Sequence, residues 1–106
     1  MAKYLIAASF TAEGVKGLVK GGGTARVDAV RKTVEGIGGK LESFHFAFGR
    51  DDAIVIVDLP DNASAAALGL AVSGSGFTTT RTIVLLTPAE IDQAAKTKVD
   101  YTPPGQ

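Results

Sequence analysis

The sequence lacks cysteine and tryptophan, and it contains a single histidine and a single methionine among 106 residues. Without cysteine there is no disulfide, no thiolate nucleophile and no cysteine-ligated metal, and one histidine cannot form a multi-histidine metal centre. Eleven basic and eleven acidic residues cancel, so the chain lacks the net positive charge that favours non-specific nucleic-acid binding. We therefore expect no bound metal, no other cofactor and no nucleic-acid partner.

Long hydrophobic runs are also absent. No apolar stretch approaches the roughly 20 residues that a membrane-spanning helix needs, and the apolar run in the first ten residues is too short for a secretion signal. We expect a cytoplasmic protein with no membrane partner. The length fits one domain, which we place at residues 1–98, with a flexible tail at residues 99–106.

The spacing of apolar residues and of breaker residues predicts the order of the elements. In chain order these are a strand (4–10), a short helix (to Lys20), an amphipathic helix (24–36), two strands (41–48 and 53–59), an alanine-rich helix (63–72), a strand (77–86) and a last short helix. The expected N-caps are Thr11, then Asp61 or Asn62, and Thr87, which has Glu90 at the spacing of a capping box.

This order predicts an α+β, ferredoxin-like βαββαβ fold, with a four-stranded antiparallel sheet and two main helices on one face. The strand at 53–59 is apolar on both faces, and so is the strand that contains Ile83 to Leu86. Because two helices cover only one face, the other would be an exposed apolar patch in a monomer. We expect a homodimer or higher oligomer that associates sheet against sheet. The alternative is that the C-terminal segment folds over the open face.

Several motifs resemble a known family. They are Thr11-x-Glu13-Gly14-Val15-Lys16, Arg26 before the amphipathic helix, Gly38-Gly39-Lys40-Leu41 and, above all, Phe48-Gly49-Arg50-Asp51-Asp52 leading into the strand that ends at Asp58-Leu59-Pro60-Asp61. Over about residues 3–95 the chain resembles the GYD domain family, whose functions are largely unassigned. The resemblance implies a ferredoxin-like fold related to the dimeric α/β-barrels.

The namesake pattern of that family is Gly-x-Tyr-Asp. Here it reads Gly49-Arg50-Asp51-Asp52, so Asp51 stands where the tyrosine is expected, and Asp58 stands where a glutamate is usual. If the tyrosine contributes to a pocket in relatives, this chain lacks that contribution.

His45 is the first candidate for a catalytic residue, because only histidine has an unperturbed pKa near physiological pH. Strand alternation places His45 with Leu41 and Ser43, opposite the three phenylalanines Phe44, Phe46 and Phe48. If those phenylalanines pack under the helices, His45 faces a cavity between subunits, together with Ser43, which is a candidate ligand-binding residue. The alternative is a structural histidine.

Arg81 and Asp52 are candidate ligand-binding residues. Arg81 lies in a threonine-rich strand, where it would hold a carboxylate or phenolate, or else be solvated at a sheet edge. Asp52 or Asp58 would pair with Arg81 or with Arg50. A simpler role for Asp52 is to close the hairpin turn by accepting backbone N–H groups.

Glu13 is the last candidate ligand-binding residue, at a plausible cavity mouth near the end of the first strand, although pairing with Lys16 accounts for it equally well. Arg26, Arg31 and Lys32 form a basic edge on the amphipathic helix, which we interpret as a solvated face.

Three functional hypotheses follow. The leading one is a homo-oligomer that binds a small apolar or anionic ligand between sheet and helices or between subunits. The second is an enzyme resembling the cofactor-independent monooxygenases or isomerases of the dimeric α/β-barrels, with His45 as acid or base and Arg81 as anion holder. The third is a purely structural or regulatory interaction module.

Overall fold

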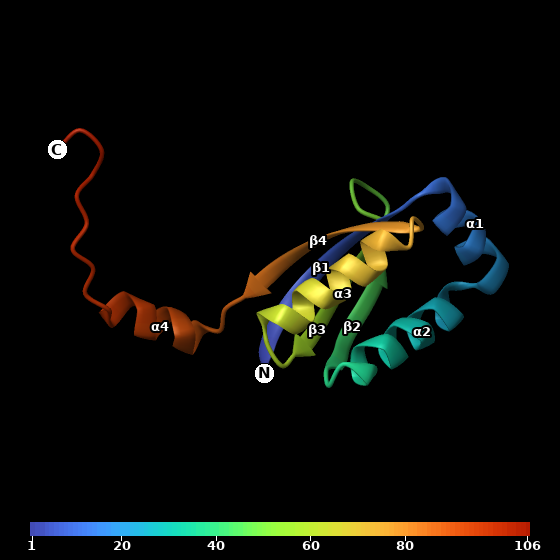
Figure 1. Ribbon diagram of the computed structural model, residues 1–106, viewed down its shortest axis with the longest axis horizontal. Coiled ribbons are helices and arrows are strands. Elements are labelled where there is room, and N and C mark those ends of the chain that lie inside the picture. Colours follow the sequence, from blue (N-terminus) through green and yellow to red (C-terminus); the bar gives the residue numbers. More distant parts are fainter.

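The computed structural model of the protein describes residues 1–106 and contains four strands and four helices, in the predicted order (Figure 1). The elements are β1 (Ala2–Phe10), α1 (Ala12–Gly21), α2 (Gly23–Gly36), β2 (Lys40–Phe46), β3 (Ala53–Leu59), α3 (Asn62–Gly74), β4 (Thr78–Leu85) and α4 (Pro88–Lys96). No helix has both the length and the apolar character needed to cross a bilayer.

The four strands form one antiparallel sheet in the order β2-β3-β1-β4, which confirms the predicted α+β, ferredoxin-like fold. The apolar strands β1 and β3 are central, and β2 and β4 are the edges. Association of two sheets in a dimer stays a prediction.

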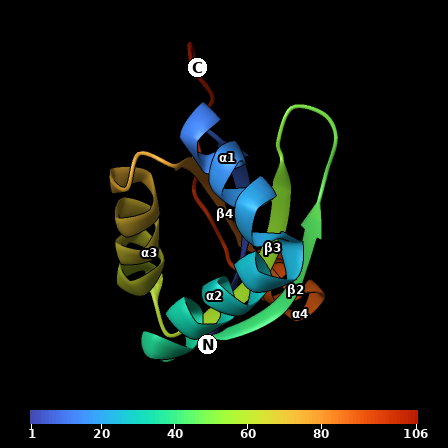
Figure 2. The same cartoon turned by 90° about the vertical axis from the view of Figure 1, so that its right-hand side faces the viewer.

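The core lies between the sheet and the helices α2 and α3 (Figure 2). Every second residue of β3 is buried on this face, from Ala53 to Leu59. Tyr4 of β1, Val34 of α2 and Leu68 of α3 complete the contact between layers. The alternate side chains of β3 and the apolar faces of α2 and α3 therefore pack together on one face of the sheet.

The predicted N-caps are confirmed. The Thr11 side chain accepts a hydrogen bond from the Gly14 N–H, Asp61 accepts one from the Ser64 N–H, and both bonds of the Thr87–Glu90 capping box are present. The break between α1 and α2 falls at Gly22, whose φ of 86° lies in the region that favours glycine.

The prediction for the strand at 41–48 is wrong in two respects. A bulge between Leu41 and Ser43 inserts Glu42, so Leu41 pairs with Val57 and packs against the core instead of sharing a face with Ser43. An extra residue in one strand reverses the alternation on one side of it. The strand also ends at Phe46, so Phe48 lies fully exposed in the following loop and does not pack under the helices.

The C-terminal segment does not fold over the open face of its own sheet. The helix α4 has no buried residue, and with the residues after it projects away from the body (Figure 1). The molecule is consequently elongated, with extents of 57 × 33 × 23 Å.

Candidate functional site

Two adjoining hollows lie between the sheet and the helices, and we call them together the helix-side cleft. The inner one is a cavity of about 50 Å³ under α2 and α3. The outer one is a groove of about 630 Å³ bordered by α1, α2 and α3. The residues that line both are Phe10, Arg26, Val30, Leu68, Val72 and Thr78.

The floor of the cleft follows from the strand register. Ile6, Ala8 and Phe10 of β1 point to the helix side, and β4 pairs with them through three threonines: Ile6 with Thr82, Ala8 with Thr80, and Phe10 with Thr78. The cleft therefore has an apolar floor with hydroxyl groups along one wall.

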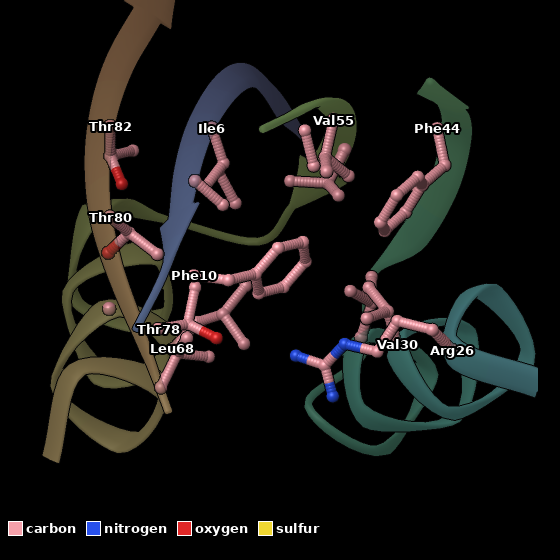
Figure 3. A pocket seen from close by; sticks show the side chains of 16 residues that line it. Ile6, Phe10, Arg26, Val30, Phe44, Val55, Leu68, Thr78, Thr80 and Thr82 are labelled. Atoms are coloured by element: carbon pink, nitrogen blue, oxygen red, sulfur yellow. The ribbon is translucent and has the colours of Figure 1, made fainter. Parts of the chain in front are cut away.

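Arg26 points into this cleft from the first turns of α2. Figure 3 shows its guanidinium group extending across the cavity toward Phe10 and Thr78. Arg26 is half-buried, and it takes part in none of the five ion pairs of the protein. An unpaired guanidinium among apolar walls carries a desolvation cost, which a bound anion would offset.

Arg26 does not lie on a solvated face with Arg31, so the prediction of a solvated basic edge is wrong for Arg26. Arg31 is exposed and pairs with Asp28 at 3.0 Å, as expected of a surface residue. Arg26, in contrast, lies four residues before Val30 and eight before Val34, which places all three on the inner stripe of α2. That spacing is the signal by which the sequence could have identified Arg26.

Glu13 and Arg26 are the two charged residues that line the cleft, and Glu13 lies in the outer groove. The Glu13 side chain is exposed and pairs with Lys16 at 3.3 Å. Small residues of α1 and α2, among them Gly17 and Ala25, form part of the same groove. The outer groove is thus lined by two charged residues, Glu13 and Arg26, whereas Arg26 is the one charged residue that lines the inner cavity.

His45 and Arg81 lie on the opposite, open face of the sheet, in one row across all four strands. The row runs His45, Ile54, Ala7, Arg81, and Ser43 lies in the next row with Ile56. Three strand spacings separate His45 from Arg81, or about 14 Å between their backbones. The structure places them on the same face but does not bring them together within one chain.

The carboxylates near Arg81 are not paired as predicted. Arg81 pairs with Asp51 at 2.9 Å, so the residue that replaces the family tyrosine is its partner. Asp52 instead accepts the Phe10 N–H at 2.8 Å, and its own N–H donates to the Ala8 carbonyl at 2.8 Å. Asp52 thus accepts a backbone N–H, as its simpler role predicts, but from β1 and not within the hairpin turn, so it joins the β2–β3 loop to β1.

Lys3 forms ion pairs with two carboxylates, those of Glu42 and Asp58. Its ammonium group lies 2.6 Å from Glu42 and 3.0 Å from Asp58, and these two carboxylates raise the pKa of Lys3 above its usual value. Asp58 therefore pairs with Lys3 and not with Arg81. No group of three or more histidine, aspartate or glutamate side chains is placed to hold a metal ion.

The fold and the cleft define a small α+β protein with a ferredoxin-like sheet, covered by helices on one face only. A family model described as the GYD domain matches residues 4–95, so the chain belongs to the GYD domain family. No curated protein and no solved structure matches the chain.

Proposed function

We propose that this protein binds a small organic anion with an apolar body in the helix-side cleft, with the anionic group on Arg26. The observation that carries the proposal is the unpaired Arg26 guanidinium inside a mainly apolar cavity in which it is the one charged group. A guanidinium offers two parallel N–H donors that match the geometry of a carboxylate.

The size of the cleft supports a small molecule as the ligand. The groove volume of about 630 Å³ falls within the roughly 300–1,000 Å³ typical of small-molecule sites. Phe10, Val30, Leu68 and Val72 supply apolar walls on both sides of Arg26, and Thr78 adds a hydroxyl group. Such walls favour an aliphatic or aromatic carboxylate over a small, strongly hydrated anion.

Binding of decanoate and 2-naphthoate, with decanol as the uncharged analogue, tests this proposal. Isothermal titration calorimetry at pH 7 would compare the native chain with Arg26→Gln and with the control Arg31→Gln, which removes the same charge from the exposed side of α2. Loss of a charge-assisted hydrogen bond of about 1.5–3 kcal/mol predicts roughly 10- to 150-fold weaker carboxylate binding for Arg26→Gln and no change for Arg31→Gln. Equal binding by both variants, or equal binding of decanoate and decanol, would refute it.

Self-association through the open face is a second proposal, and it has its own observation. The centre of this face is apolar, with Leu5, Ile54, Ile56 and Ile83 in adjacent rows. No helix covers these side chains, and Ile83 is 44% exposed. Light scattering should therefore give a mass of at least twice 10.9 kDa. A chain that stays monomeric at about 100 µM, which excludes a dissociation constant in the low micromolar range, would contradict self-association.

Acid–base catalysis by His45 with Arg81 as anion holder would require a substrate that spans the open face, because the backbones of the two residues lie about 14 Å apart in one chain, and Arg81 is already paired with Asp51. The arrangement in one chain therefore supports ligand binding more directly than catalysis. If His45→Ala left the turnover of aromatic or polyketide-like substrates unchanged, His45 would be excluded as the base.

A further inference from the structure

The chain exposes much more surface than a compact protein of its size. Its radius of gyration is 16.9 Å, against about 13 Å for a compact domain of this length. Its accessible surface is 7290 Å², against about 5,600 Å² for a folded monomer of this mass. The excess of about 1,700 Å² per chain exceeds the roughly 800 Å² that each partner buries in a standard protein–protein interface.

Much of this extra surface belongs to residues 86–106, which we call the C-terminal arm. Its large apolar side chains are solvent-exposed: Leu86, Ile91, Val99 and Tyr101 are 58%, 51%, 74% and 68% exposed. The helix α4 has nine residues, and isolated helices shorter than about 12–15 residues are marginal in water. The capping box and Pro88 favour the first turn of α4, but the helix needs a surface to pack on.

The connection to β4 directs the arm away from its own sheet. Only Leu86 and Thr87 separate β4 from α4, and Thr87 is extended, with φ −78° and ψ 158°. Thr87 and Glu90 hold the first turn of α4 to this extended residue through two hydrogen bonds of 3.0 and 3.1 Å. Folding back onto the open face would require a reversal at this joint.

The family match indicates that α4 is a constituent part of the domain. The family match extends to residue 95, in the last turn of α4, although α4 makes few contacts with the rest of the protein. A helix that belongs to the domain but does not pack on its own sheet points to a packing surface on another molecule.

We infer that the C-terminal arm of one copy packs on the open sheet face of a second copy, and that the two copies exchange arms. This inference rests on the self-association proposed above and specifies how it occurs. Each chain has one uncovered apolar face and one arm without a packing surface. In a two-fold symmetric pair, the arm of each copy covers the open face of the other. Ile91 of α4 would lie against the apolar row that contains Ile56, Leu5 and Ile83.

The absence of cysteine allows a direct cross-linking test on the full chain. Ile91→Cys and a mass-tagged Ile56→Cys would be purified separately, mixed and oxidised. We expect a disulfide-linked pair of one arm variant and one sheet variant. The control pairs Ile91→Cys with Ala66→Cys, an exposed position on α3, and should give little product.

A second measurement uses charge instead of a cross-link. Ile91→Asp should weaken dimerisation by on the order of tenfold to a hundredfold, because it would bury an unpaired carboxylate. The matched control, Gln93→Asp, adds the same charge two residues away on the other side of α4 and should have little effect. Sedimentation equilibrium measures both dissociation constants.

The outcomes separate the inference from the proposal on which it rests. A native dimer that Ile91→Asp leaves intact, with cross-links only between two Ile56→Cys chains, would overturn arm exchange and support direct sheet-to-sheet packing. An intramolecular disulfide in a monomeric Ile56→Cys/Ile91→Cys variant would also overturn exchange. A native chain that stays monomeric would refute self-association altogether.

Discussion

Replacing Gly14 with alanine should destabilise the protein, although alanine is the better helix former. Gly14 lies in the first turn of α1, where that helix passes over the start of β4. An added Cβ atom would lie 2.1 Å from the Phe77 carbonyl oxygen and 3.3 Å from the Phe10 Cβ. A carbon and an oxygen cannot approach so closely, so α1 or the backbone at Phe77 has to move.

The structure sets the size of the effect. The Phe77 carbonyl accepts the Thr11 N–H at 3.0 Å and the Thr11 hydroxyl at 3.2 Å, so displacing it disturbs two hydrogen bonds worth about 1 kcal/mol each. Overpacking adds about 1–3 kcal/mol to the cost in unfolding free energy, and the higher helix propensity of alanine offsets about 1 kcal/mol of it. Gly14→Ala should therefore cost about 2–4 kcal/mol, which lowers the melting temperature by on the order of 10–20 °C.

Gly17→Ala is the matched control on the same helix. A Cβ atom at Gly17 meets nothing within 4 Å, so only the propensity term remains and the variant should gain about 0.5–1 kcal/mol. Circular dichroism melts of both variants, at one protein concentration, would measure the two effects. A Gly14→Ala variant as stable as the native chain would refute the argument from the close approach of α1 to Phe77.

Three further variants test the core, a polar contact and a helix cap. Leu59 is fully buried in the core, so Leu59→Ala should cost about 2–5 kcal/mol in urea unfolding; a loss well below this range would place Leu59 outside the core. The Tyr4 hydroxyl donates to Asn62 Oδ1 at 2.6 Å, so Tyr4→Phe should lower the unfolding free energy by about 0.5–1.5 kcal/mol with an unchanged denaturant slope. Hydrogen bonds from the Ser64 N–H and hydroxyl lower the pKa of Asp61 below its ordinary value of 3.8. Because the pKa is lower in the folded state, this stabilisation is present above pH 3.8 and is lost as the pH falls through the folded pKa. Asp61→Asn keeps a good N-cap without the titration, so its melting temperature should fall less on acidification; an identical acid profile would contradict this role.

The features that depend on a few neighbouring residues were predictable from the sequence. The caps at Thr11, Asp61 and Thr87 were identified because an N-cap bonds to groups two or three positions away. The break at Gly22 and the alternation of β3 are equally local, and both agree with the structure. The element order then left the ferredoxin-like topology as the natural arrangement.

The candidate site was predicted only in part, because it depends on which strands become neighbours. Alternation placed Ser43 and His45 together on one face, which the structure leaves open, but the face of Arg81 and its distance from His45 follow from the strand order β2-β3-β1-β4. The pairing of Arg81 with Asp51 also depends on tertiary structure, since 30 residues separate the partners. Neither fact is encoded in a local spacing.

The sequence by itself determined the elements, three of their caps and the presence of strands that are apolar on both faces, because these features rest on spacing within one segment. The order of the elements then determined the fold class. Only the tertiary structure decided that Arg26 points into an apolar cleft, that Leu41 turns inward at a bulge and that the C-terminal arm leaves its own sheet uncovered. The physical reason is that side-chain environment depends on the elements packed against a residue, which the spacing within one segment does not contain. For this protein, the lack of cysteine and the single histidine excluded thiol chemistry and multi-histidine metal centres, and the packing then placed one unpaired guanidinium in the cavity beneath the helices.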